Sequence, residues 1–262
     1  IERIGKPLKE WDVNIYRGVL TGLNEAFIID TPTREFLVAE DPKNAEILKP
    51  ILRGRDIKRY SYDWAGLWLI NTGFDLNIPK EYPAIFRHLK RFEEKAKKRD
   101  DQGQNWWNLR ACAYYEEFEK EKIVWQEMSD ESSFSYDNSS LYCNDTGRIM
   151  TGKNIKFFVA LFNSTFFCNT FVKYYSGGGL GEKGIRFKHT FMGKFHIPLI
   201  TTFNKSIVNQ MEINVDKILS LKKKNANLET SEYERKIDEV VYKLYELKEE
   251  EIRIVAGRNK LD

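Results

Sequence analysis

Residues 156–169, KFFVALFNSTFFCN, form a long apolar stretch that contains five phenylalanines. Such a stretch must be covered by other parts of a folded protein, because its side chains have few polar groups to offer to water. It is shorter than the roughly 20 residues that a membrane-spanning helix needs, and no other apolar run approaches that length. The sequence therefore predicts a buried helix here.

The remaining composition allows a sizeable core but leaves the class of protein open. The chain has 262 residues, of which 42% are hydrophobic and 31% charged, so we expect one large domain or one domain with an appendage. A net charge of +3 is too small to identify a nucleic-acid-binding protein by itself. The positions of the charges must carry that argument.

The cysteines and the first residues indicate where such a chain works. Cys112, Cys143 and Cys168 are far apart and odd in number, which argues against a disulfide framework or a zinc site and fits a reducing, cytoplasmic setting. The start, IERIGKPLKEW, has neither an initiator Met nor the apolar stretch of a signal peptide. We therefore expect a piece of a longer protein.

The pattern of apolar residues predicts a mixed α+β fold. Short apolar runs broken by Gly, Asn and Pro predict β-hairpins within residues 1–39, and GLWLINTG and KIVW read as further strands. Helical spacing predicts an amphipathic helix over residues 82–99. After Pro198 two amphipathic stripes predict a helical hairpin, so we divide the chain into residues 1–200 and a helical segment of residues 201–262.

The stretch YYSGGGLGEKGIRFK, residues 174–188, contains a run of three glycines, Gly177, Gly178 and Gly179. It does not match a P-loop, because Ile185 follows Gly184, and no strand opens it as a dinucleotide fingerprint requires. A flexible turn and a ligand-facing loop both fit the glycines. The cations that follow them, Lys183, Arg186 and Lys188, favour a loop that faces an anion.

The sequence offers little for catalysis. Two E-x-K triplets, at residues 93–95 and 234–236, resemble nuclease motifs but lie on predicted exposed helices, and the three histidines lack metal-ligand spacing. No two prolines are adjacent, so the chain lacks the motif with which amino-methyltransferases hold the exocyclic nitrogen. We expect no catalytic residues, no metal and no cofactor in this chain.

Basic residues interleaved with aromatic ones remain. ILRGRDIKRY places Arg53, Arg55, Lys58 and Arg59 around one glycine, and QNWWNLRACAYY places Arg110 beside a tryptophan pair. The first stretch fits phosphate contacts, and it also fits a solvated turn in which Asp56 pairs with an arginine. For the two tryptophans, burial in the core is the simpler expectation.

Several of these stretches, taken in order, resemble one family. They are PLKEWDVNIYRGVLTGLNEAFIID, ILKPILRGRDIKRY, WWNLRACAYYEEFEKEKIVW, KFFVALFNSTFF, the Gly-rich loop with FHIP, and KIDEVVYKLYELKEEEIRIV. Together they are similar to the TaqI-like C-terminal specificity domain of adenine-specific DNA methyltransferases, especially the fused type IIG restriction-modification enzymes and their phage-defence relatives.

The resemblance implies a non-catalytic DNA target-recognition domain that partners double-stranded DNA and an N-terminal methyltransferase domain of the same polypeptide. Adenine flipping and methylation, with S-adenosylmethionine and with Mg²⁺ for cleavage, would belong to the parent enzyme. DNA contacts are expected from Arg53, Arg55, Lys58, Arg59, Lys183, Arg186 and Lys188, from the three glycines, and from Thr21, Asn24 and Arg110. A separately encoded specificity subunit and a metal-dependent nuclease remain as alternatives.

Overall fold

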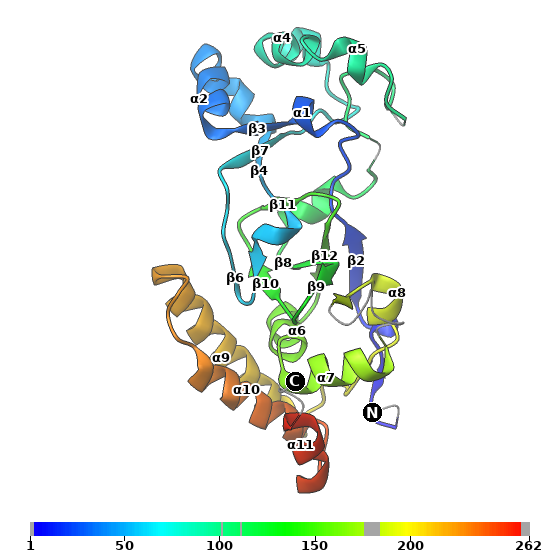
Figure 1. Ribbon diagram of the computed structural model, residues 1–262, viewed down its shortest axis with the longest axis vertical. Helices are drawn as coiled ribbons and strands as arrows, with labels where there is room; N and C mark the ends of the chain where they lie inside the picture. The colour runs from blue at the N-terminus through cyan, green and yellow to red at the C-terminus, as the bar shows by residue number, and fades with distance from the viewer. Residues whose placement is uncertain (1–2, 101, 111, 176–183, 258–262) are drawn as a thin grey trace.

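The computed structural model describes residues 3–100, 102–110, 112–175 and 184–257. It has an α+β fold in which helices lie at both ends of the long axis of the molecule and the sheets lie between them (Figure 1). This confirms the fold class that the sequence predicts.

A four-stranded sheet, in the order β10-β8-β12-β2, lies in the middle of the molecule, and all its neighbouring strands are antiparallel. Its strands are β2 (Val13–Arg17), β8 (Lys122–Gln126), β10 (Phe134–Asp137) and β12 (Gly147–Gly152). Because side chains alternate along a strand, Trp125 and Met150 enter one hydrophobic core while Val124 and Ile149 enter the other. The sheet therefore separates two cores, and we call it the central sheet.

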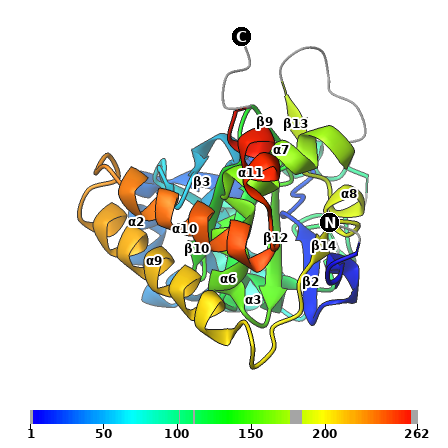
Figure 2. The same cartoon turned by 90° about the horizontal axis from the view of Figure 1, so that it is seen from below.

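The lower core is built from the apolar stretch and the C-terminal helices, which lie below the central sheet in Figure 1 and in front of it in Figure 2, where the molecule is seen from below. Its helices are α6 (Ile155–Phe162), α7 (Thr165–Tyr174), α9 (Lys205–Lys224), α10 (Ser231–Leu244) and α11 (Glu249–Ala256). Val208, Met211 and Val241 are completely buried in this core. The predicted hairpin after Pro198 is confirmed, and the domain boundary near residue 200 stays a prediction.

The upper core lies on the other face of the central sheet and contains a second four-stranded sheet in the order β11-β4-β7-β3. Its strands are β3 (Ile28–Asp30), β4 (Leu48–Leu52), β7 (Leu67–Ile70) and β11 (Tyr142–Cys143). Its helices are α1 (Asn24–Phe27), α2 (Thr31–Glu40), α3 (Ile78–Glu81), α4 (Pro83–Lys90) and α5 (Glu93–Ala96), with 3₁₀ turns η2 (Pro42–Ile47) and η4 (Tyr115–Glu119).

Short elements complete the fold around these two cores. Three two-stranded pairs join β1 (Lys6–Pro7) to β14 (His196–Ile197), β5 (Ile57–Lys58) to β6 (Ser61–Tyr62), and β9 (Met128–Ser129) to β13 (Ile185–Arg186). The remaining turns are η1 (Leu8–Glu10), η3 (Gly54–Asp56) and α8 (His189–Met192).

The predicted N-terminal hairpins are wrong. β1, β2 and β3 each pair with a strand from much later in the chain, and EFLVA lies in helix α2. Asp30 begins that helix because its carboxylate accepts a hydrogen bond from the backbone N–H of Thr33 at 2.9 Å, and Pro32 suits the first turn. Tertiary pairing and a helix cap thus replace the local turns that we expected.

The two long helices predicted for residues 82–99 and 156–169 are each divided. The first becomes α4 and α5, and the second becomes α6 and α7, which meet at a bend of 70°. At that bend Ser164 caps α7, and the buried Asn163 exchanges two hydrogen bonds with the backbone of Phe134 on edge strand β10. Asn163 therefore satisfies the N–H of Phe134 at this strand edge and shares its carbonyl with the N–H of Tyr60, which donates at 3.1 Å.

Among the described residues no single helix is long and apolar enough to cross a membrane, and only the bent pair of α6 and α7 reaches that length and composition together.

Phe134 joins the central sheet to the lower core, since its ring contacts those of Trp125, Phe162, Phe167 and Phe187. We expect Phe134→Ala to lower the free energy of unfolding by about 3–5 kcal/mol, because it leaves a cavity in this aromatic cluster. Chemical denaturation measures this loss. Phe203→Ala is the matched control: that ring is 96% exposed, so its removal should change stability by less than about 0.5 kcal/mol.

Candidate nucleic-acid interface

A hollow of about 480 Å³ opens where one end of the central sheet meets the β9–β13 pair. We call it the basic hollow. Its lining residues are Ile15, Tyr16, Arg17, Tyr114, Glu127, Arg148, Arg186, Lys188 and His189.

Strand pairing brings these distant residues together. In the register of β2 and β12, Arg17 lies directly opposite Arg148. β13 pairs with β9 and places Arg186 opposite Met128, while the backbone N–H of Phe187 donates to the carbonyl of Glu127 at 2.8 Å. Two arginines thus come from neighbouring strands of the sheet, and a third comes from the chain that crosses its end.

The cross-strand pair of Arg17 and Arg148 is unfavourable in itself, because like charges directly opposite each other in a sheet repel. Asp145 offsets part of this repulsion. Its carboxylate lies 3.4 Å from Arg17 Nη2, and its carbonyl accepts a hydrogen bond from Arg148 Nη1 at 3.1 Å. Arg17 remains half-exposed, so its charge also faces solvent.

Glu127 is the buried acid of the basic hollow and holds two arginines. One carboxylate oxygen accepts from Arg148 Nη2 and the other from Arg186 Nε, the latter at 3.0 Å. Arg148 is only 8% exposed, and its Nε has no hydrogen-bond partner among the described residues. Burial, and then the nearby charge of Arg17, lowers the pKa of Arg148 to about 10, so the side chain is still protonated at neutral pH.

The basic hollow keeps a net positive charge. Arg17, Arg148, Arg186 and Lys188 contribute four positive charges, and the carboxylates of Glu127 and the adjoining Asp145 contribute two negative ones, which leaves +2. The rings of Tyr16 and Tyr114 stack with centroids 4.7 Å apart and form an aromatic wall. Uncompensated cations beside an aromatic wall suit an anionic ligand that carries flat rings.

The predicted basic turn at residues 53–59 adjoins this site. The N–H of Gly54 donates to Thr146 Oγ1 at 3.0 Å, next to the Asp145 that holds Arg17. A Cβ on Gly54 would lie 2.8 Å from that oxygen, so the close approach requires glycine. Arg55 and Lys58 on this turn are exposed.

Two arginines of the same turn make ion pairs within the chain, and their contact with DNA stays a prediction. Arg53 makes a two-pronged ion pair with Asp56, with Nε and Nη2 at 2.9 and 2.7 Å. Arg59 Nε donates to Glu234 on α10 at 2.6 Å and so ties the turn to the C-terminal helices. The pairing of an arginine with Asp56, which the sequence left open, is therefore present, and it engages Arg53 alone of the four cations.

The remaining predicted contacts lie elsewhere. Thr21 is buried and donates to Asn24 Oδ1 at 2.6 Å, while Arg110 lies next to the tryptophan pair and accepts a hydrogen bond from Tyr115 on its carbonyl. The tryptophans, Trp106 and Trp107, pack against Phe86 beside the upper core and are only half-buried, so the expected burial in the core is partial. Gly177, Gly178, Gly179 and Lys183 lie outside the described residues.

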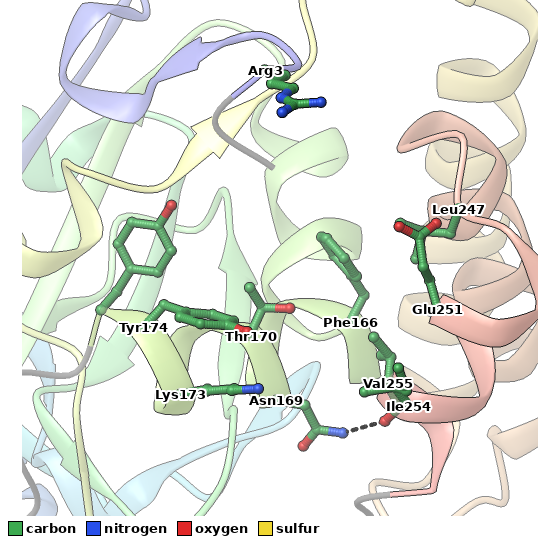
Figure 3. Close-up of a pocket in the computed structure, with 11 residues that line it drawn as sticks. Arg3, Phe166, Asn169, Thr170, Lys173, Tyr174, Leu247, Glu251, Ile254 and Val255 are labelled. Atoms are coloured by element: carbon green, nitrogen blue, oxygen red, sulfur yellow. Dashed lines mark hydrogen bonds between the residues drawn. The ribbon is translucent and has the colours of Figure 1, made fainter.

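A groove of about 690 Å³ between α7 and α11 differs in character (Figure 3). Phe166, Leu247, Ile254 and Val255 line it, and Asn169 Nδ2 crosses its base to donate to the Val255 carbonyl at 2.7 Å. Arg3 and Lys173 also line this groove, but most of its exposed lining is apolar, unlike that of the basic hollow.

A family model matches part of this chain. The TaqI-like C-terminal specificity domain matches residues 49–183, which is just over half of the chain. The chain belongs to this family. The match confirms the resemblance found in the sequence. A search of curated proteins gave no match.

Two solved structures share the fold of this specificity domain. One is the type IIL restriction-modification enzyme MmeI, solved in complex with DNA, with 13% identity and a TM-score of 0.70 over 98% of this chain. The other is the type IIG restriction endonuclease BpuSI, with 12% identity and a TM-score of 0.57 over 94% of this chain. The chain spans 36% and 32% of the lengths of these proteins, about one third in each case.

Of the residues predicted from sequence, the basic hollow of the specificity domain contains Arg186 and Lys188. Sequence reasoning missed Arg17, Glu127, Arg148 and His189. Arg17 and Arg148 each lie alone in a segment with the pattern of a strand, so no cluster of basic residues in the sequence points to them. One signal could have found them. Arg17 ends the segment VNIYR and Arg148 is the second residue of GRIMTG, so the two arginines lie at the same end if these segments pair as antiparallel strands.

His189 offers a direct test of the charge in the basic hollow. Burial, and then the charges of Arg148 and Lys188, lower its pKa below the ordinary value of 6.5. A DNA phosphate beside it would favour the charged ring, so we expect duplex DNA to raise this pKa and DNA affinity to rise as the pH falls from 7 to 6. Two-dimensional NMR of the histidine rings, recorded over a pH series, measures the pKa of His189 with and without DNA.

The same spectra contain a control. His88 lies on α4, is buried beside the upper core and does not line the basic hollow, so its resonance should not respond to DNA. His189→Gln should remove part of the gain in affinity at low pH. A His189 resonance that titrates identically with and without DNA would place the DNA elsewhere.

Proposed function

We propose that this chain is the DNA target-recognition domain of a restriction-modification enzyme of the fused type IIG kind. In this proposal it holds duplex DNA while an N-terminal methyltransferase domain of the same polypeptide methylates adenine at N6. Membership in the specificity-domain family supports a role in DNA recognition within restriction-modification. The observation that carries the proposal is the basic hollow, where four cations and one carboxylate line the site and the carboxylate of Asp145 adjoins it.

The proposed contacts divide by position. The exposed Arg55 and Lys58 reach phosphates from the turn at residues 53–59, because a charge contact with a phosphate does not require a fixed side-chain orientation. The basic hollow takes a recessed part of the same duplex beside the stacked tyrosines. Gly177, Gly178 and Gly179 with Lys183 would let the neighbouring loop approach the DNA backbone, as the sequence suggests.

The chemistry of methylation and cleavage is proposed for the rest of the parent enzyme. S-adenosylmethionine and Mg²⁺ would bind there, and the parent would act in the cytoplasm as a defence against phage DNA. In this proposal the chain positions the DNA and selects its sequence.

We expect the chain to bind duplex DNA with an affinity that falls steeply with salt, because each neutralised phosphate adds about 0.9 to the slope of log affinity against log salt. Arg55→Ala should reduce that slope by about one and weaken binding to all sequences alike. Fluorescence anisotropy over a salt series measures both. Arg253→Ala on α11 removes another exposed charge, one that does not line the basic hollow, and should leave the slope unchanged.

We also expect the chain alone to leave DNA unmethylated and uncut with S-adenosylmethionine and Mg²⁺ present. Gel assays and mass spectrometry of the DNA test this. Among the described residues Glu93 pairs with Lys97 at 2.6 Å and Lys95 with Glu25 at 2.8 Å, so this E-x-K triplet is engaged on the surface. Cleavage that requires Mg²⁺ and disappears in Lys95→Ala would favour the nuclease alternative instead.

A further inference from the structure

We propose that Arg186 reads a guanine in the major groove and that Glu127 positions it for this contact. The inference rests on the proposed function in DNA recognition and assigns it a specificity-determining residue. Guanine presents two acceptors, O6 and N7, to the major groove, and the guanidinium fork of arginine matches them in a bidentate contact.

The orientation of Arg186 is set at its Nε atom. That atom donates to Glu127 Oε1 at 3.0 Å, and Glu127 is in turn held by Arg148 through its other oxygen. With Nε engaged, the two terminal Nη atoms form the open end of the fork, and neither has a partner among the described residues. The side chain is 43% exposed, so this open end can reach a ligand while its stem stays fixed.

The backbone beside Arg186 is equally constrained. Its strand pairs with β9, and the next residue, Phe187, is buried with its ring against Phe171 and Phe134. The indole of Trp125 donates to the Phe187 carbonyl at 2.9 Å. A side chain fixed at both its backbone and its Nε loses little freedom on binding, which favours a contact that depends on exact geometry.

The other arginines near the site differ from Arg186 in the use of their forks. Arg17 in the same hollow places Nη2, one end of its fork, 3.4 Å from the Asp145 carboxylate. Arg53 uses its fork on Asp56, and Arg59 bonds Glu234. Arg148 bonds Glu127 and two backbone carbonyls. Arg55 is exposed without an anchor in the described part of the chain, which suits a phosphate. Arg186 combines a carboxylate anchor with an open fork, the arrangement that base reading requires.

Removing the negative charge of Glu127 should have two separate effects on DNA binding. Its negative charge weakens attraction to any phosphate, so Glu127→Gln should bind arbitrary DNA at least as tightly as the original chain. The same change weakens the anchor of Arg186, so discrimination between sequences should fall. A purely structural residue would not separate these two effects.

The experiment is selection of the chain on a library of randomised duplexes, followed by sequencing of the bound DNA. The original chain should enrich a motif with guanine at a defined position. Arg186→Ala should lower the preference for that guanine by about 5- to 150-fold and leave the other positions enriched. Arg186→Lys keeps the charge but not the fork, so it should keep the salt slope and lose the same preference.

Matched variants and melting curves complete the design. Arg55→Ala, the control, should weaken binding while the motif is unchanged. The inference is overturned if Arg186→Ala weakens all sequences equally, which would make it a phosphate contact, or if it leaves the motif intact. Absence of any DNA binding by the original chain would instead contradict the proposed function itself, so the two failures are distinguishable.

Discussion

The antiparallel register of β12 between β2 and β8 determines both the core and the site. Along β12 the pleat sends Ile149 to the upper core and Met150 to the lower one, so a single strand joins the two halves of the molecule. The same register places Arg148 between Arg17 on one side and Trp125 on the other. A shift of one residue would exchange the faces of every side chain on β12 and would remove the basic hollow together with both cores.

This arrangement has an electrostatic cost that the fold only partly offsets. Arg17 and Arg148 face each other across a strand pair, and Arg186 approaches from outside the sheet. Glu127 and Asp145 compensate two of the charges, and the pKa of Arg148 stays lowered by burial and by Arg17. A structure selected for stability alone gains nothing from the remaining positive charge, whereas an anionic ligand would remove the repulsion on binding. The remaining charge therefore supports the proposed role of the basic hollow in binding DNA.

Sequence reasoning succeeded where local pattern determines the outcome. The phenylalanine-rich stretch, the strand KIVW and the two C-terminal helices were predicted because their apolar periodicity is decided within each segment. The N-terminal hairpins failed because β2 finds its partner more than a hundred residues later, and the bend at Asn163 escaped notice because its reason is a hydrogen bond to strand β10. Arg186 and Lys188 were found beside a conspicuous glycine run. Arg17, Glu127 and Arg148 join them only through strand register, which periodicity does not reveal.

Hydrogen–deuterium exchange of the chain with and without duplex DNA tests the central claim most directly, because it locates the bound surface without substitutions. The account predicts protection in peptides that cover β2, the turn at residues 53–58, β9, the start of β12 and residues 185–189, where the basic hollow and its neighbouring turn lie. Peptides from α11, which lines the apolar groove, should be unchanged. Protection confined to α9, α10 and α11, with none around Arg148 and Arg186, would contradict the account.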